Sequence, residues 1–261
     1  MNVKTAHPVP PLSIDHIQPN GRLRGRVALV TGGTSGIGRA IAVALAREGA
    51  RVCIIGRSDI RLADASAEIN RFAECKVFQV DLTGPDSHKR IIEHFRQDGS
   101  QLDILVHSAG VVRIDVGADG QMADFDFQYA INVRAPYVLT KQLQPMLAAG
   151  RGQVVFINSS AGLTAKQPEL TQYAATKHSL RAIADSLREE LNPKGIRVLT
   201  FYLGRTATRL QEALYRQHGV TYRPELLLQP SDVASLLIDV LLLPATAEVT
   251  DISMRPMFKS Y

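Results

Sequence analysis

The feature that most constrains the fold is an alternation of short apolar runs with longer helical patterns, which begins at residue 26. The apolar runs are continuous and do not alternate with polar residues, as in RVALVT, RVCIIG and GQVVFINSS. Continuous apolar strands separated by helices are typical of a parallel sheet that helices cover on both faces. We therefore predict one α/β domain built on a doubly wound parallel β-sheet.

The limits of the predicted elements follow from the same pattern. Strands are expected at about 26–31, 51–56, 76–81, 102–110, 152–160, 195–204 and 247–254. Helices are expected at about 36–49, 59–72, 85–97, 122–149, 172–191 and 231–243. Residues 205–229 have an irregular or short-helical pattern, and we predict that they form a substrate lid that orders on binding.

Composition excludes several classes of protein. The chain has 261 residues and a net charge of +5, but its arginines are scattered and form no dense basic tract for nucleic acid. No apolar run reaches the 18 or so residues of a membrane span, and the N-terminus has no apolar signal region. Two cysteines without metal-ligand spacing indicate free thiols, and we expect a cytoplasmic protein without a metal site.

A glycine-rich loop, TGGTSGIG, joins the first predicted strand to the first helix. Gly32, Gly36 and Gly38 allow a tight turn and let a pyrophosphate approach backbone N–H groups at a helix N-terminus. The strand before the loop and the helix after it supply the context that such a motif requires. The loop therefore predicts a Rossmann-type dinucleotide-binding domain over residues 25–261, preceded by an extended, proline-rich arm at 1–24.

The end of the second strand indicates which dinucleotide binds. NAD-binding domains carry an acidic residue there for the ribose hydroxyls, but this chain has Gly56 followed by Arg57 and Ser58. The guanidinium of Arg57 matches a 2′-phosphate, so NADP(H) is preferred over NAD(H). Asp81 and Leu82 follow the third strand and either bound the adenine pocket or, for the aspartate, cap the next helix.

The stretch YAATK places Tyr173 and Lys177 four residues apart, which is about one helical turn. The residues alone leave two readings open: two polar side chains on a solvated helix, or a proton-transfer pair. A free tyrosine has a pKa near 10, and a lysine beside the phenol would stabilise the tyrosinate and lower that pKa.

Together these motifs resemble those of the classical short-chain dehydrogenases/reductases, in family order over about residues 25–253. HSAG at 107–110 resembles the family's NNAG, with His107 and Ser108 in place of two asparagines. Asn132 in INVRAP occupies the place of the family's helix asparagine. Ser160 in INSSAG stands thirteen residues before Tyr173, which is the usual spacing of the family, and YAATK matches its YxxxK.

The resemblance implies a catalytic tetrad of Asn132, Ser160, Tyr173 and Lys177. Tyr173 would donate or accept the proton, Ser160 would donate a hydrogen bond to the carbonyl oxygen, and Asn132 would hold a water beside Lys177. Ser159 is the less suitable serine, because strand alternation points it to the other side.

Two further features come from the resemblance. The family has Pro-Gly after the sixth strand, where this chain has Leu203 and Gly204 followed by Thr206. The predicted substrate pocket comprises the lid and Val111, Val112, Ala161, Gln167, Leu170 and Tyr202. The predicted cofactor-binding set is Gly32, Thr34, Ser35, Gly36, Ile37, Gly38, Arg57, Ser58, Asp81, Leu82, Ser108, Ala109, Gly110, Tyr173, Lys177, Gly204 and Thr206.

The sequence thus predicts an NADP(H)-dependent oxidoreductase, a homodimer or homotetramer, that acts on a ketone or secondary alcohol. Acyl thioesters, cyclic ketones, sugars and steroids all remain open as substrates. One alternative is a dinucleotide-binding redox sensor or scaffold without turnover, and another is an NAD-dependent dehydrogenase of the same family. An extended-family epimerase or dehydratase also uses YxxxK, but it carries TGxxGxxG and a longer C-terminal domain.

Overall fold

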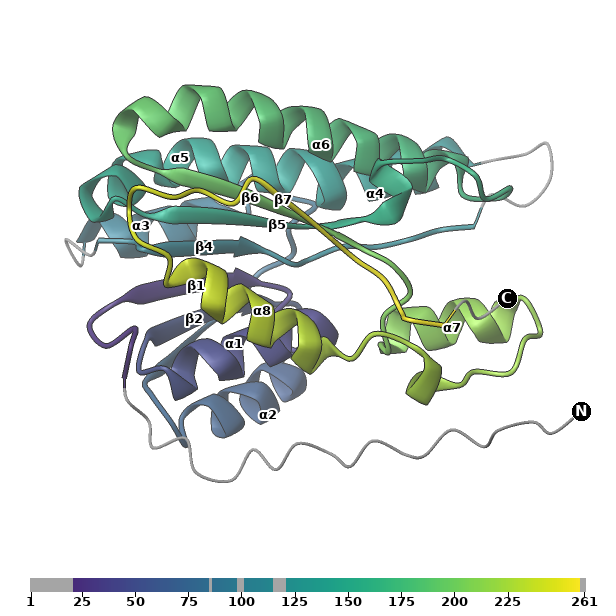
Figure 1. Ribbon diagram of the computed structural model, residues 1–261, viewed down its shortest axis with the longest axis horizontal. Helices are drawn as coiled ribbons and strands as arrows, with labels where there is room; N and C mark the ends of the chain where they lie inside the picture. Colours follow the sequence, from purple (N-terminus) through teal and green to yellow (C-terminus); the bar gives the residue numbers. More distant parts are fainter. Residues whose placement is uncertain (1–20, 85, 98–100, 115–120, 259–261) are drawn as a thin grey trace, which may run out of the picture.

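A parallel β-sheet forms the centre of the protein (Figure 1). The computed structural model describes residues 21–84, 86–97, 101–114 and 121–258. Within these residues the sheet has seven strands in the order β3-β2-β1-β4-β5-β6-β7, and every neighbouring pair is parallel. Helices cover both of its faces. This arrangement confirms the predicted doubly wound sheet in a single domain.

The strands are β1 Val27–Thr31, β2 Arg51–Gly56, β3 Cys75–Gln79, β4 Ile104–His107, β5 Gln153–Ser159, β6 Arg197–Leu203 and β7 Asp251–Met254. The helices are α1 Gly36–Arg47, α2 Asp59–Ile69, α3 Lys89–Gln97, α4 Met122–Tyr129, α5 Ala135–Gly150, α6 Thr171–Leu191, α7 Arg209–Gln217 and α8 Pro230–Leu241. A π-helical turn, Ala130–Arg134, separates α4 from α5, and short 3-10 turns lie at Ser160–Gly162, Asn192–Lys194 and Pro224–Leu226.

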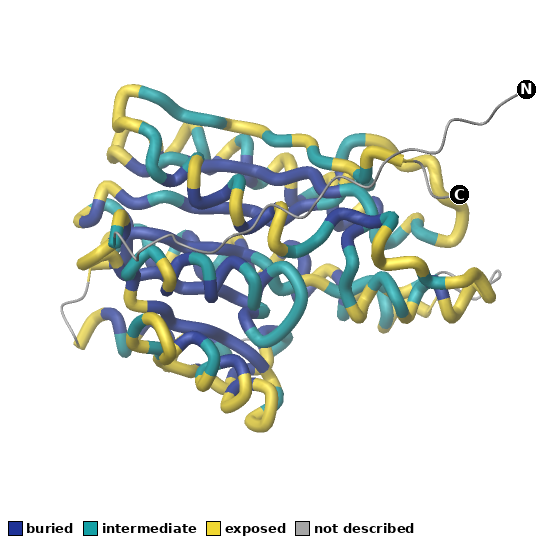
Figure 2. Tube along the Cα trace, turned by 60° about the horizontal axis from the view of Figure 1, so that its bottom comes forward, coloured by how far each residue is buried: buried dark blue, intermediate teal, exposed yellow. Residues whose placement is uncertain are grey.

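The core consists of two apolar layers, one on each face of the sheet. Val30 and its neighbours on one face pack against α1, α2 and α8. Leu29, one residue earlier, points to the opposite face and packs against α3, α5 and α6. Successive strand residues point to opposite faces, so burial on both sides requires the continuous apolar runs seen in the sequence. Figure 2 shows the buried strands between more exposed helices.

The N-terminal boundary of the domain differs from the prediction. Residues 1–20 of the predicted arm lie outside the described residues, but residues 21–24 belong to the domain. Leu23 is buried and its N–H donates to the carbonyl of Glu48, while Arg22 forms an ion pair with the Glu48 carboxylate at 2.6 Å. These contacts fix the segment against the end of α1, so it is not an extended arm.

Two other segments differ from what their sequence pattern predicts. The helical stretch predicted at 122–149 is interrupted by the π-helical turn that contains Asn132. In the predicted lid, α7 forms a regular helix and Thr206 pairs with Leu228 in an isolated β-bridge. The N–H of Ala207 donates to the Leu228 carbonyl at 2.7 Å, so the two ends of the lid are joined at its base.

Candidate functional site

A cavity of about 880 Å³ lies at the carboxyl ends of the strands. Its walls come from the segments that follow β1 to β6, together with α7. β1 lies between β2 and β4, which is where the order of the strands reverses along the chain. Open α/β sheets bind their ligands at this switch point, so the position of the cavity is typical of a ligand-binding site.

The glycine loop lines one end of the cavity and leaves no room for side chains. Gly32 has a φ of +69°, and a Cβ there would lie 2.9 Å from the backbone of Ala109. A Cβ on Gly38 would lie 2.4 Å from the carbonyl oxygen of Gly32. Ser35 precedes α1 but makes no side-chain cap, so the first N–H groups of that helix stay available to an anion.

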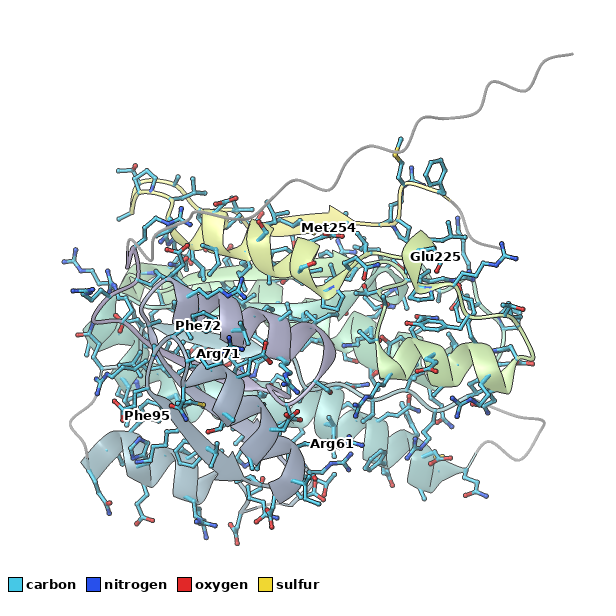
Figure 3. The ribbon with its side chains drawn as sticks, turned by 90° about the horizontal axis from the view of Figure 1, so that it is seen from below. Arg61, Arg71, Phe72, Phe95, Glu225 and Met254 are labelled. Carbon is cyan, nitrogen blue, oxygen red and sulfur yellow. The ribbon has the colours of Figure 1, made fainter. Side chains whose placement is uncertain are left out.

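Two arginines line the cavity near the end of β2. Arg57 follows the strand and Arg61 lies on the first turn of α2, where Figure 3 labels it. Among the described residues neither guanidinium has an ion-pair partner. Arg39 differs, because Asp64 and Glu68 hold its guanidinium at 2.5 and 2.7 Å. Sequence reasoning missed Arg61, although its position one helical turn after Arg57 was a usable signal.

Asp81 lies in the cavity wall and does not cap the next helix, because α3 begins only at Lys89. Its carboxylate accepts hydrogen bonds from the N–H and hydroxyl of Thr83 at 3.0 and 2.9 Å. These hydrogen bonds, with a smaller contribution from the charge of Arg57, lower the pKa of Asp81 below its usual value. Leu82 is buried and also lines the cavity.

Tyr173 lies on the first turn of α6, half-buried in the cavity wall, and it contacts Ser159 instead of Ser160. The Ser159 hydroxyl forms a hydrogen bond with the Tyr173 phenol, whereas Ser160 is exposed. Ser160, the serine predicted to donate to the carbonyl oxygen, also lines the cavity, and its predicted role stays a prediction. β5 ends at Ser159 and a 3-10 turn begins at Ser160, so the alternation used to reject Ser159 no longer applies there.

Lys177 is buried one turn after Tyr173, and both side chains line the cavity. The ammonium nitrogen lies 5.8 Å from the centroid of the Tyr173 ring and donates to the carbonyl of Ile157 at 3.3 Å. Burial lowers the pKa of Lys177 to about 8. Burial also raises the pKa of Tyr173, and the hydrogen bond with Ser159 acts in the opposite direction. The predicted lowering of the tyrosine pKa by Lys177 is thus not found.

The backbone of Lys177 is fixed against the end of β5. The Asn158 side chain donates to the Lys177 carbonyl at 3.1 Å, and a Cβ on Gly162 would lie 2.8 Å from the same oxygen. The close approach that Gly162 permits therefore sets the distance between α6 and the segment carrying Ser159.

Asn132 is buried in the π-helical turn and does not line the cavity. Its side-chain oxygen accepts from the Val111 N–H at 2.9 Å, and its nitrogen donates to the Val111 carbonyl at 2.9 Å and to Thr176 at 3.1 Å. These bonds tie the segment after β4 to α6. Asn132 thus joins two walls of the cavity, and the water that it would hold beside Lys177 stays a prediction.

His107, the replacement for a family asparagine, is buried beneath the cavity. Its Nε2 lies 2.8 Å from the Thr140 hydroxyl, and its ring stacks on Phe156. Its Nδ1 has no partner among the described residues. Burial lowers the pKa of His107 to about 3, so the imidazole is neutral and structural.

Every residue of the predicted cofactor set lines the cavity, as do Val111, Val112, Ala161, Gln167 and Leu170 of the predicted substrate pocket. Tyr202 does not, because it is buried within β6. Leu203, which replaces the family proline, continues β6, and the Gly204 N–H donates to the Met254 carbonyl at 2.7 Å. Arg205, Thr208 and Arg209 line the cavity within the predicted lid, where Thr208 caps α7 and lies against Gly36. Sequence reasoning missed the cavity-lining residues Arg61 and Lys166, and it set Ser159 aside.

No group of three or more histidine, cysteine, aspartate or glutamate side chains among the described residues is arranged to hold a metal ion. No helix within them is both long and apolar enough to span a bilayer.

Comparisons with known proteins agree with this geometry. The family model for short chain dehydrogenase matches residues 26–219. An uncharacterized oxidoreductase of Staphylococcus saprophyticus is 29% identical over 238 residues, which cover 90% of this chain and 99% of the relative.

Two solved structures are similar over most of their length. Pseudomonas aeruginosa RhlG in an NADP active-site complex is 28% identical, with a TM-score of 0.77, and the match covers 91% of this chain and 98% of that one. A short chain dehydrogenase of Burkholderia cenocepacia in complex with NADP is 29% identical, with a TM-score of 0.76 over 89% and 97% of the two chains. The chain therefore belongs to the short-chain dehydrogenase family of oxidoreductases.

Proposed function

We propose that the protein is an NADP(H)-dependent oxidoreductase that interconverts a ketone and a secondary alcohol. The observation that carries this proposal is the juxtaposition of Tyr173, Lys177 and Ser159 in the wall of a cavity whose other end is the glycine loop. The three side chains offer a proton, a positive charge and a hydrogen-bonding hydroxyl at one place.

The residues at the glycine loop fit a dinucleotide. A backbone surface that excludes Cβ atoms at Gly32 and Gly38, next to an uncapped helix N-terminus, suits a pyrophosphate. Arg57 and Arg61 would hold a 2′-phosphate, and this favours NADP(H) over NAD(H). The NADP complexes of two similar structures support the same preference. When bound, the nicotinamide ring supplies or accepts the hydride.

Tyr173 acts as the general acid in reduction. Its pKa lies above the usual value because of burial, so the phenol keeps its proton at neutral pH and has one to donate. Lys177, with a pKa of about 8, is mostly charged at neutral pH and stabilises the tyrosinate that forms.

Ser159 takes the role that the sequence assigned to Ser160. Its hydroxyl is within hydrogen-bonding reach of the Tyr173 phenol, so a carbonyl oxygen beside that phenol would accept bonds from both. Asn132 is a positioning residue, because its side chain joins Val111 to Thr176 on the helix that carries Tyr173 and Lys177.

A screen of carbonyl compounds with NADPH tests the proposal, with Tyr173→Phe as the variant. We expect NADPH consumption with at least one ketone. We also expect the kcat of Tyr173→Phe to be about 10²–10⁴-fold lower, with the Kd for NADPH nearly unchanged. A variant that keeps more than about a tenth of the kcat would contradict the role of Tyr173. NADPH binding without turnover of any carbonyl would favour the redox sensor or scaffold.

An NAD-dependent dehydrogenase of the same family is the other candidate. The ratio of kcat/KM for NADPH to kcat/KM for NADH distinguishes it from the proposed NADP(H)-dependent enzyme. The homo-oligomer and the cytoplasmic location stay predictions from the sequence.

A further inference from the structure

The mouth of the cavity lies between the loop at residues 163–170 and helix α7. Lys166 and Gln167 of the loop line the cavity, as do Arg209 and Gln211 on the first turn of α7. The loop leads directly into the helix that carries Tyr173, so this part of the cavity is the substrate end. His218, just after α7, lies 3.3 Å from Glu169 of the loop, which places the two walls side by side.

The cations at this mouth are not balanced by acids. Among the described residues that line the cavity, the only carboxylate is that of Asp81, which follows β3 at the opposite end. Lys166 and Arg209 are exposed, and within the described part of the chain neither has an ion-pair partner.

The glutamates closest in sequence lie against other side chains. Glu169 lies against His218 and Glu212 against Arg216 at 3.4 Å, and neither glutamate lines the cavity. Arg205 also lines the cavity, but its guanidinium packs over the Tyr215 ring, 5.7 Å from the ring centroid.

A neutral ketone has no net charge that the cations of Lys166 and Arg209 could attract. Two cations that line one end of a cavity, with no carboxylate among the described lining residues of that end, raise the local concentration of an anion and attract it. From this arrangement we infer that the carbonyl substrate carries an anionic group, a carboxylate or a phosphate, which Lys166 and Arg209 bind while the carbonyl reaches Tyr173. The inference rests on the proposed carbonyl reduction, and it narrows the four substrate classes left open by the sequence to charged compounds.

Matched pairs of probes that differ only in charge test the inference. The pairs are 4-oxopentanoate with its methyl ester, and dihydroxyacetone phosphate with dihydroxyacetone. We expect kcat/KM of the wild type to favour the charged member of at least one pair by about tenfold or more, and the preference to shrink as salt screens the charges. The pair with the larger ratio tells a carboxylate from a phosphate substrate.

The variant for this test is Lys166→Gln with Arg209→Gln, and the matched control is Arg90→Gln with Arg96→Gln. Arg90 and Arg96 are exposed on α3 and do not line the cavity. The double variant should reduce the charged-to-neutral ratio about tenfold, and the control should leave the ratio as it is in the wild type. Equal kcat/KM for both members of both pairs would overturn the inference and leave the proposed function standing.

A binding measurement decides the inference even if no probe is reduced. Calorimetric titration of the NADP⁺-saturated protein with the same pairs should give tighter binding of a charged member, and that advantage should be lost in the double variant. If neither charged member binds more tightly than its neutral partner, the inference is wrong. Absence of NADPH consumption with every carbonyl tested bears on the proposed function instead.

Discussion

The two ends of the cavity are built in different ways. At the cofactor end, backbone atoms make the surface: a Cβ on Gly32 or Gly38 has no space, and the N-terminus of α1 is uncapped by side chains. At the substrate end, side chains of the 163–170 loop and α7 make the surface, and several of them, such as Lys166 and Arg209, are exposed.

The difference teaches which part of the site the fold determines. A backbone surface follows from the strand order and from glycines at a few positions, so it comes with the architecture. A surface of exposed side chains carries little packing constraint, so its chemistry belongs to this particular sequence. Tyr173 and Ser159 lie where the two ends meet.

The largest effect is expected where the two ends of the cavity meet, at Ser159 and Tyr173. Ser159→Ala removes the serine hydroxyl that is hydrogen-bonded to Tyr173. This change should lower the kcat of carbonyl reduction by about 10²–10³-fold, which is the usual loss for one such donor. Ser160→Ala is the matched control, because this neighbouring serine is exposed, and it should stay within about threefold of wild type. Steady-state kinetics of both variants checks the assignment, and the reverse pattern would restore Ser160.

The next effect concerns side chains at the cofactor end. Arg57→Gln and Arg61→Gln should each lower the ratio of kcat/KM for NADPH over NADH. Loss of one charge-assisted contact, worth about 1.5–3 kcal/mol, corresponds to roughly 10- to 150-fold. Arg39→Gln is the control, because Asp64 and Glu68 already hold that side chain. A wild type that prefers NADH would contradict the proposed cofactor.

A third prediction tests whether backbone shape governs the cofactor end. In Gly38→Ala the new methyl group would meet the Gly32 carbonyl at 2.4 Å, so the loop must shift. Overpacking of this kind costs about 1–3 kcal/mol, or roughly 5- to 150-fold in the Kd for NADPH. Gly84→Ala is the control, since the nearest atom to its Cβ is 3.6 Å away. Fluorescence titration with NADPH measures both, and equal affinities would refute the comparison.

The smallest expected effect is a pH dependence. The pKa of Lys177 is lowered to about 8 by burial, so the ammonium is charged below pH 8 and loses its proton as the pH rises through that value. The kcat/KM for NADPH, which reports groups of the free enzyme, should fall above about pH 8. In Lys177→Arg the charge persists, so the fall should move to higher pH. A profile that is flat to pH 10 in the wild type would contradict this role.

The same lowered pKa affects stability in the opposite direction. Between about pH 8 and the usual lysine pKa of 10.5, the unfolded chain binds more protons at this position than the folded protein. The contribution of Lys177 to the free energy of unfolding therefore rises with pH in this window.

How far the sequence predicted the molecule differs between the fold and the site. The parallel sheet was predictable because continuous apolar runs are required for strands buried on both faces, and the glycine loop identified its own position. The serine that is hydrogen-bonded to Tyr173 was not predictable, since a residue count cannot show that β5 ends at Ser159 and that the chain then turns. Arg61 was missed, and Arg209 was not singled out within the predicted lid, because exposed arginines at the starts of helices are common and carry no periodic signal.

The role of Asn132 was also beyond the sequence. Its interactions with Val111 and Thr176 depend on a π-helical turn, and no residue pattern in 122–149 indicated one. Similarly, neighbouring charge alone suggested a lowered pKa for Tyr173, whereas burial raises the pKa of Tyr173 above its usual value.

The hydroxyl of Thr31 has one further consequence. It accepts hydrogen bonds from the N–H groups of Ser108 and Ala109 at 3.1 Å each and lies 3.4 Å from the carbonyl of Val106, so the end of β1 is fastened to the segment after β4. The stretch of cavity wall formed by Ser108 and Ala109 is therefore fixed when the sheet forms, so its ordering entropy is lost during folding and not when a ligand binds.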